Sequence, residues 1–149
     1  VEKICLNAII LDVITLYSNK INDKKTEVLY DFAKDYFIKS DNYLVSIIIS
    51  NVISNAIKYS GQNGKVSINL SKKGSKTICS ISDNGIGIAK EDLDRIFNPF
   101  YRSDAINHPD IKGSGLGLSI VKKISQLLHV AIEVNSIVNQ GTTIVLTFN

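Results

Sequence analysis

Two glycine-containing segments hold the residues whose types and spacing are best suited to ligand binding. The first is Asp-Asn-Gly-Ile-Gly-Ile at 83–88, and the second is Gly-Ser-Gly-Leu-Gly-Leu at 113–118. Glycine lets a backbone approach a ligand closely, and the N–H groups at the start of a helix bind anions. Because a helix is expected to begin near Gly117, the second segment predicts a phosphate site. Taken alone, the first segment is also compatible with a hairpin turn and the second with a flexible loop before a helix.

Asp83 ends a segment that alternates like a strand. Side chains of a strand point alternately to its two faces, so a strand over 77–83 places Cys79, Ile81 and Asp83 on one face. If that face is the core, the Asp83 carboxylate needs a hydrogen-bond donor. The amino group of adenine is such a donor, whereas guanine presents an acceptor oxygen at the equivalent edge. Asp83 therefore predicts a preference for adenine.

A polar stripe interrupts the most apolar helix, which is expected from Ser40 or Asp41 to about Tyr59. Asn51, Asn55 and Lys58 follow one another at i, i+4 and i+7, so they share a face. Amides on a core-facing helix need partners, and a carboxamide oxygen is a suitable ligand for Mg²⁺. The alternative is that both amides only hydrogen-bond to backbone. The glycine segments favour the ligand-binding interpretation.

The composition indicates one ordinary globular domain. Among 149 residues, 44% are hydrophobic and 21% are charged, and the net charge is only +3. Aromatic residues do not alternate with basic ones, which argues against nucleic-acid binding. No apolar run approaches the ~20 residues that span a bilayer. We therefore expect a cytoplasmic, monomeric domain without direct membrane contact, even if the full-length protein is membrane-anchored.

The hydrophobic periodicity predicts a mixed set of helices and strands. Two extended segments at 27–32 and 36–39 are expected to pair as a hairpin through residues 33–35. Residues 101–113 have no periodicity and are expected to form a long loop. The remaining expected elements are helices at 5–16, 41–59, 93–98 and 117–129, and strands at 66–71, 77–83, 132–137 and 142–148.

Four sequence blocks resemble those of sensor histidine kinases. Over about 41–149, in the family's order, residues 51–60 resemble the N box, 83–88 the first glycine box, 96–102 the F box and 113–118 the second glycine box. Gly141-Thr142 resembles the family's terminal Gly-Thr. The resemblance implies an α+β Bergerat-type fold. This is a two-layer sandwich in which helices cover one face of a mixed, largely antiparallel sheet, with an ATP lid at 101–113.

The resemblance also implies roles for individual residues with ATP and Mg²⁺ as cofactors. Asp83 would bind adenine N6, Asn55 would coordinate Mg²⁺, and Asn51 and Lys58 would approach the phosphates. Gly85, Gly87 and Thr142 would line the base side, and Gly113, Gly115 and Gly117 the phosphate side. The implied nucleotide-binding set is completed by Tyr59, Ile88, Phe97, Arg102, Lys112, Ser114, Leu116 and Leu118. For Arg102 and Lys112, a role as solvated loop cations stays open.

Asn51 bears on the type of reaction. Hydrolytic relatives resemble one another in carrying a general-base glutamate at the matching position, four residues before Asn55. An amide cannot take a proton from water, so the resemblance implies slow hydrolysis and phosphoryl transfer to a histidine. The two histidines, His108 and His129, match no acceptor motif.

The expected organisation is therefore a catalytic domain that acts on a separate domain. Residues 41–149 would form the ATP-binding core. Residues 1–40 would supply a helix and edge strands that link it to a dimerisation domain bearing the acceptor histidine. A response regulator would act downstream. The alternative is a nucleotide-binding regulatory module, of the anti-sigma or degenerate-kinase type, without phosphotransfer; Phe97 and Pro99 of the F box favour the kinase.

Overall fold

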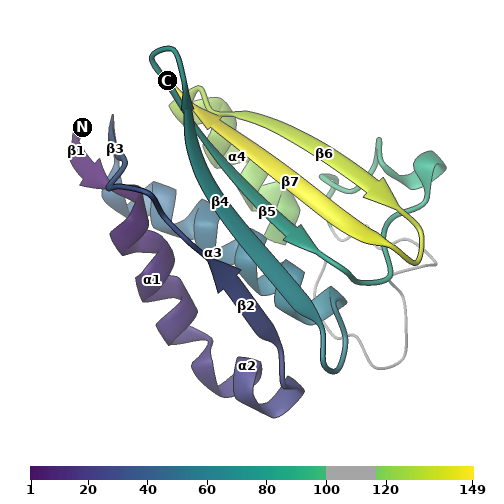
Figure 1. The fold of residues 1–149 in the computed structure, drawn as a ribbon. Helices are drawn as coiled ribbons and strands as arrows, with labels where there is room; N and C mark the ends of the chain where they lie inside the picture. Colours follow the sequence, from purple (N-terminus) through teal and green to yellow (C-terminus); the bar gives the residue numbers. More distant parts are fainter. Residues whose placement is uncertain (100–116) are drawn as a thin grey trace.

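A five-stranded sheet forms the frame of the molecule (Figure 1). The computed structural model describes residues 1–99 and 117–149. The strand order is β2-β4-β5-β7-β6; β2 runs parallel to β4, and the other neighbouring pairs are antiparallel. A separate two-stranded sheet pairs β1 with β3. The strands are β1 (Glu2–Cys5), β2 (Glu27–Tyr30), β3 (Phe37–Ser40), β4 (Lys65–Lys73), β5 (Lys76–Asp83), β6 (Ala131–Ile137) and β7 (Gly141–Phe148).

The helices lie on one side of this sheet. In Figure 1, α3 and α4 lie behind the strands, and α1 lies beside α3. The arrangement is the two-layer α+β sandwich with a mixed, largely antiparallel sheet that the sequence predicts, and this prediction is confirmed. The helices of the described residues are α1 (Leu6–Leu16), α2 (Ser18–Lys24), α3 (Asn42–Tyr59), α4 (Gly117–Leu128) and a short 3₁₀ helix, η1 (Lys90–Asp92).

The hairpin expected between 27–32 and 36–39 is wrong. Strand β2 pairs in parallel with β4, whereas β3 pairs with β1 in the small sheet. The side chain of Asn7 explains how the connection between them is held. Its Nδ2 atom donates to the carbonyl oxygen of Lys34, and its Oδ1 atom accepts from the amide of Tyr36 over 2.8 Å. A buried amide near the start of α1 therefore anchors the segment between the two strands.

The helix α3 has the start and the end that the sequence predicts. The Asp41 side chain accepts a hydrogen bond from the amide of Leu44 over 2.9 Å, which satisfies one of the free N–H groups of the first turn. Just past the other end, Gly61 takes a φ of 75°, a left-handed conformation that favours glycine. These two signals set where α3 begins and ends, and its apolar residues decide which face is buried.

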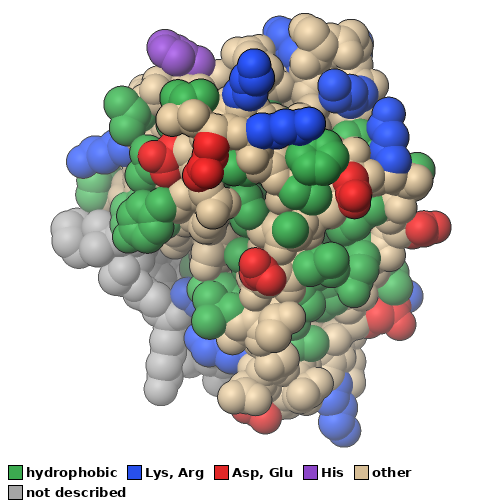
Figure 2. All heavy atoms as spheres, turned by 90° about the vertical axis from the view of Figure 1, so that its left-hand side faces the viewer, with side chains coloured by type: hydrophobic (Ala, Val, Ile, Leu, Met, Phe, Trp, Pro, Cys, Tyr) green, Lys and Arg blue, Asp and Glu red, His purple; other side chains and the backbone are tan. Residues whose placement is uncertain are grey.

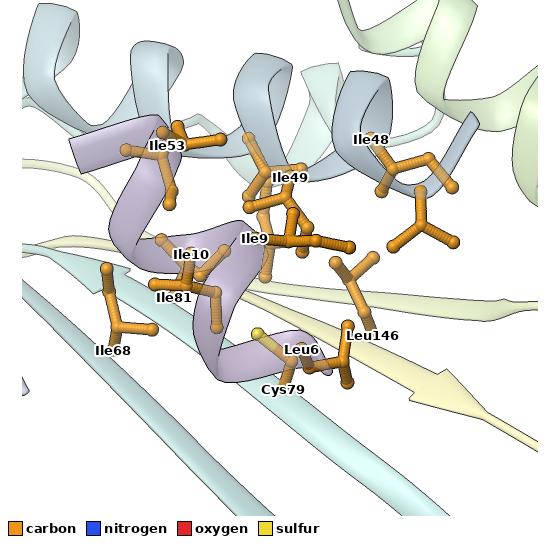
Figure 3. Close-up of a cluster of buried hydrophobic side chains, with 14 of the residues drawn as sticks. Leu6, Ile9, Ile10, Ile48, Ile49, Ile53, Ile68, Cys79, Ile81 and Leu146 are labelled. Atoms are coloured by element: carbon orange, nitrogen blue, oxygen red, sulfur yellow. The ribbon is translucent and has the colours of Figure 1, made fainter. Parts of the chain in front are cut away.

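The core joins α1, α3 and the sheet (Figure 3). Side chains of α1 and α3 point toward one another and toward the inner face of the strands. Fully buried isoleucine and leucine dominate this cluster, and burying each such side chain contributes roughly 1.5–3 kcal/mol. The labelled members are Leu6, Ile9, Ile10, Ile48, Ile49, Ile53, Ile68, Cys79, Ile81 and Leu146.

The α-helix expected at 93–98 is also wrong. The chain instead forms η1 and then successive tight turns. The amides of Arg95 and Asn98 donate to carbonyl oxygens three residues earlier, those of Asp92 and Arg95, both over 2.9 Å. Such i→i+3 bonds wind the chain more tightly than an α-helix does. Ile96 is nonetheless buried, with 3% of its surface exposed.

The side of the molecule that carries α1 has a mixed surface. Figure 2 shows hydrophobic side chains lying between charged ones on this face. Leu16 at the end of α1 and Phe37 in β3 are among the exposed hydrophobic residues. In the part of the chain that the structure describes, no helix is long and apolar enough to cross a membrane.

Candidate functional site

A cavity of about 190 Å³ lies between α3 and the inner face of the sheet. Its walls come from α3, from the end of β5 with the segment that follows, from the start of α4, and from β7. The lining residues are Asn51, Val52, Ser54, Asn55, Ala56, Lys58, Tyr59, Ile81, Asp83, Gly87, Ile88, Ile96, Gly117, Leu118, Thr142 and Ile144. Aliphatic side chains and a few polar groups are both present, as is usual for small-molecule sites.

The two asparagines of α3 direct their oxygens toward the start of α4. The Nδ2 atom of Asn51 donates to the carbonyl oxygen of Ile47 over 2.8 Å, which orients the Oδ1 atom. A Cβ atom built on Gly117 would lie 3.1 Å from Asn51 Oδ1 and 3.8 Å from Asn55 Oδ1. Both amide oxygens are therefore beside the N-terminus of a helix, where N–H groups attract anions.

Asp83 places a carboxyl group in the other part of the cavity. Burial raises its pKa to about 6, while hydrogen bonds from the backbone of Gly85 and Thr142 counteract part of that rise. The amide of Gly85 donates to Asp83 Oδ1 over 2.8 Å. The inward orientation expected from the alternation of Cys79, Ile81 and Asp83 is confirmed, since Cys79 and Ile81 are buried on the same face.

The segment after Asp83 is held between α3 and the turn that joins β6 to β7. The amide of Ile86 donates to the carbonyl oxygen of Tyr59 over 3.3 Å, and the carbonyl oxygen of Ile86 accepts from the amide of Asn139 over 2.8 Å. A Cβ atom on Gly85 would lie only 1.9 Å from the Tyr59 carbonyl oxygen. Gly85 is therefore required for the close approach of this segment to the end of α3.

Gly87 is required for a different reason. Its φ is 71°, and a Cβ atom there would lie 2.2 Å from the carbonyl oxygen of Ile137. Conformation and space thus both exclude a side chain at this position. The two glycines bring the backbone of 83–88 against α3 on one side and against the end of β6 on the other.

Ser136 also belongs to this site, although no sequence motif includes it. Its Oγ atom accepts from the amide of Ile88 over 2.7 Å, donates to the carbonyl oxygen of Gly141 over 3.1 Å and bonds to Thr142 Oγ1 over 2.8 Å. The signal was present in β6, where Ser136 follows Ile132 and Val134 on the core-facing side. A polar residue at an inward position of a strand needs partners.

The structure brings most of the predicted residues of the described chain to one cavity. Phe97 does not line it; its ring instead lies 5.5 Å from the Lys122 ammonium, and Ile96 reaches the cavity in its place. Gly85 packs behind the cavity wall. The predicted residues on the wall are Asn51, Asn55, Lys58, Tyr59, Asp83, Gly87, Ile88, Gly117, Leu118 and Thr142. Arg102, Lys112, Gly113, Ser114, Gly115, Leu116 and the lid at 101–113 lie outside the described residues.

Comparison with known families agrees with this geometry. Residues 40–149 match the model of the family described as histidine kinase-, DNA gyrase B- and HSP90-like ATPase. The chain belongs to this ATPase family. The family match includes every residue of the cavity wall, from Asn51 to Ile144.

Two similar relatives within this ATPase family are sensor kinases. The sensor histidine kinase WalK of Bacillus subtilis is 37% identical over 116 residues, which are 76% of this chain and 19% of WalK. The signal transduction histidine-protein kinase ArlS of Staphylococcus aureus is 45% identical over 96 residues, which are 64% of this chain and 21% of ArlS. The chain thus spans about a fifth of the length of these relatives.

Solved structures of histidine kinases share the fold. The catalytic domain of ThkA superposes with a TM-score of 0.83 at 26% identity, covering 98% of this chain and 94% of that one. ShkA in complex with AMPPNP superposes with a TM-score of 0.84 at 26% identity, covering 98% of this chain and 30% of ShkA. ThkA in complex with the response regulator TrrA superposes with a TM-score of 0.81 at 25% identity, covering 98% of this chain and 40% of that one.

Proposed function

We propose that this domain binds Mg-ATP and donates the γ-phosphate to a histidine on a separate dimerisation domain. The observation that carries the proposal is the distribution of polar groups in one cavity. Asp83 offers a buried acceptor for the base, and the oxygens of Asn51 and Asn55 face the start of α4. Along α3, about 12 Å separate Asn51 from Tyr59, and the carbonyl oxygen of Tyr59 holds the segment that follows Asp83.

The amide oxygens of this site are suited to Mg²⁺. In residues 1–99 and 117–149, no three His, Cys, Asp or Glu side chains gather to hold a metal ion. Mg²⁺ at nucleotide sites keeps several waters and takes one or two protein ligands together with phosphate oxygens. Asn55 would hold the metal, which when bound neutralises phosphate charge. Asn51 and Lys58 would orient the phosphates against the first turn of α4.

The same residues favour transfer over hydrolysis. Asn51 holds its Nδ2 atom against the carbonyl oxygen of Ile47, and its Oδ1 atom cannot remove a proton from water. A neutral imidazole is already a nucleophile, so the domain needs only to position the γ-phosphate and stabilise its charge. The names of WalK and ArlS and the AMPPNP complex of ShkA support this assignment. The ThkA–TrrA complex supports a response regulator as the downstream partner.

Calorimetry with Mg-ATP tests the binding half of the proposal. We expect Asn55→Ala to abolish the difference between titrations with Mg²⁺ and with EDTA. The matched control is Asn69→Ala, because Asn69 is an exposed asparagine of β4. An unchanged magnesium dependence in Asn55→Ala contradicts the metal assignment.

Transfer is tested with a separately prepared histidine-bearing hairpin domain and γ-labelled ATP. We expect acid-labile label on the hairpin, and slow release of phosphate when the hairpin is omitted. Binding of ATP without any transfer would instead support a regulatory nucleotide-binding module. Rapid hydrolysis by the domain alone would contradict the role given to Asn51.

A further inference from the structure

Ser136 connects three parts of the site through one hydroxyl group. The partners of its Oγ atom are the Ile88 amide, the Gly141 carbonyl oxygen and Thr142 Oγ1, at 2.7, 3.1 and 2.8 Å. A serine hydroxyl has one hydrogen to donate and two lone pairs to accept with. Three contacts use this capacity completely.

The chemistry of two partners fixes the direction of the third bond. The Ile88 N–H can only donate, and the Gly141 carbonyl can only accept. The single hydrogen of Ser136 is therefore directed to Gly141. The contact between Ser136 and Thr142 is then a bond in which Thr142 donates. Thr142 also has one hydroxyl hydrogen, so its remaining capacity toward the cavity is to accept.

Thr142 is paired with Asp83, another polar residue of the cavity wall. The two residues are opposite one another in the antiparallel ladder of β5 and β7, and both line the cavity. The ionised Asp83 carboxylate also only accepts. With the Thr142 proton turned toward Ser136, both side chains present lone pairs to the base.

We infer that Ser136 is a specificity-determining positioning residue, which fixes the Thr142 hydroxyl as an acceptor so that the pocket selects a purine bearing an amino group. This inference rests on the proposed function, because it concerns the base of the nucleotide held in the same cavity. A 6-oxo purine presents an acceptor where the pocket holds acceptors. Without Ser136, the Thr142 hydroxyl rotates and donates to that oxygen.

The test compares calorimetric affinities for Mg-ATP and Mg-ITP at pH 8, where Asp83 is ionised. We expect Ser136→Ala to reduce the ATP-over-ITP preference about three- to tenfold, the size of one neutral hydrogen bond. The double variant Ser136→Ala/Thr142→Val restores the preference, because valine cannot donate. The matched control is Ser82→Ala, since Ser82 Oγ forms a similar 2.8 Å contact with Thr143 Oγ1. Ser82 and Thr143 are each one residue from Asp83 and Thr142 along their strands, so they lie on the opposite face of the sheet.

Each outcome is decisive. An equal loss of affinity for both nucleotides in Ser136→Ala shows a merely structural role and overturns the inference. If the wild-type domain binds neither nucleotide, the proposed function fails rather than the role of Ser136. Should Ser136→Ala not fold, NMR of the wild-type hydroxyl protons answers the same question. A Thr142 proton directed to Ser136 supports the inference, and a Ser136 proton directed to Thr142 overturns it.

Discussion

The Nζ atom of Lys24 donates a hydrogen bond to the carbonyl oxygen of Lys58 over 2.8 Å, and this bond joins α2 to the last turn of α3. The same ammonium also donates to the carbonyl oxygen of Ile57. Carbonyl groups at the end of a helix have no partner within the helix. Lys24 therefore caps, from outside, the helix that carries Asn51, Asn55 and Lys58.

Replacing Lys24 by methionine is expected to destabilise the domain. A hydrogen bond to a charged group contributes ~1.5–3 kcal/mol, and the partial exposure of Lys24 reduces this to roughly 1 kcal/mol. We also expect weaker Mg-ATP binding, because Lys58 and Tyr59 line the cavity. Urea unfolding and calorimetry measure the two effects. Lys72→Met, at an exposed position of β4, is the control and should change neither; equal behaviour of the two variants argues against the cap.

The pKa of Asp83 predicts a pH dependence of stability. Burial raises this pKa to about 6 in the folded domain, above the value of ~3.9 for an unfolded chain. Protonation therefore favours folding, so the contribution of Asp83 to stability is complete below pH ~4 and is lost as the pH rises through 6. Carboxyl ¹³C shifts of Asp83 measure the pKa directly, and a midpoint near the ordinary value contradicts the prediction.

The isosteric Asp83→Asn variant tests the same contribution of Asp83 to stability. At pH 8 we expect it to be more stable than wild type, on the order of 1–3 kcal/mol, because a buried charge is removed. At pH 4 the gain should vanish. Nucleotide titration at pH 8 should show weaker ATP binding by this variant, since an amide cannot replace both carboxylate acceptors. A loss of stability at pH 8 would mean that the hydrogen bonds from Gly85 and Thr142 outweigh burial.

A substitution at Gly117 is expected to change nucleotide binding without changing folding. Alanine there would place a methyl group 3.1 Å from Asn51 Oδ1, at the site expected for phosphate and metal. Gly117 is the first residue of α4, and a Cβ atom there meets only the ends of the Asn51 and Asn55 side chains, so we expect Gly117→Ala to change the melting temperature little. Affinity for Mg-ATP should fall about tenfold or more, as for the loss of a charge-assisted contact. Thermal denaturation and calorimetry on one preparation give both results, and undiminished affinity contradicts the placement of the phosphates.

Gly85 and Gly74 differ in what an added methyl group would meet. A Cβ atom on Gly85 would lie 1.9 Å from the Tyr59 carbonyl oxygen, whereas the same atom on Gly74 meets nothing within 4 Å. Gly74→Ala should cost only ~1–2 kcal/mol for its left-handed conformation. Gly85→Ala should cost clearly more and should also weaken nucleotide binding. Chemical denaturation compares them, and similar costs would show that the 83–88 segment moves freely away from α3.

Local signals were sufficient for α3 and for the orientation of Asp83. Asp41 caps the helix as expected, and alternation along β5 identifies the buried face without knowledge of its neighbours. The hairpin between 27–32 and 36–39 was wrong because pairing is decided by distant partners, β4 and β1. A short extended segment carries no information about which strand it will join.

The site itself was predictable to the extent that its residues lie in glycine-rich or amphipathic segments. The inward position of Ser136 in β6 indicated that it needs polar partners, but the partners themselves, Ile88 and Thr142, are 48 and 6 residues away in the sequence and could not be identified from it. Ile96 was missed in favour of Phe97, because the resemblance of the F box pointed to Phe97, whereas the tight turns after η1 bring Ile96 to the cavity. Both errors concern contacts that depend on the packing of several elements.

The pairing of β5 with β7 makes the proposed nucleotide site dependent on strand register. Cys79 faces Leu146, Ile81 faces Ile144, and Asp83 faces Thr142, all on the helix-covered side. A shift of one residue in either strand would turn its polar group outward and its core residues into solvent. The buried pairs therefore hold the register of the two strands, and the free energy gained by burying them also keeps Asp83 and Thr142 side by side at the cavity.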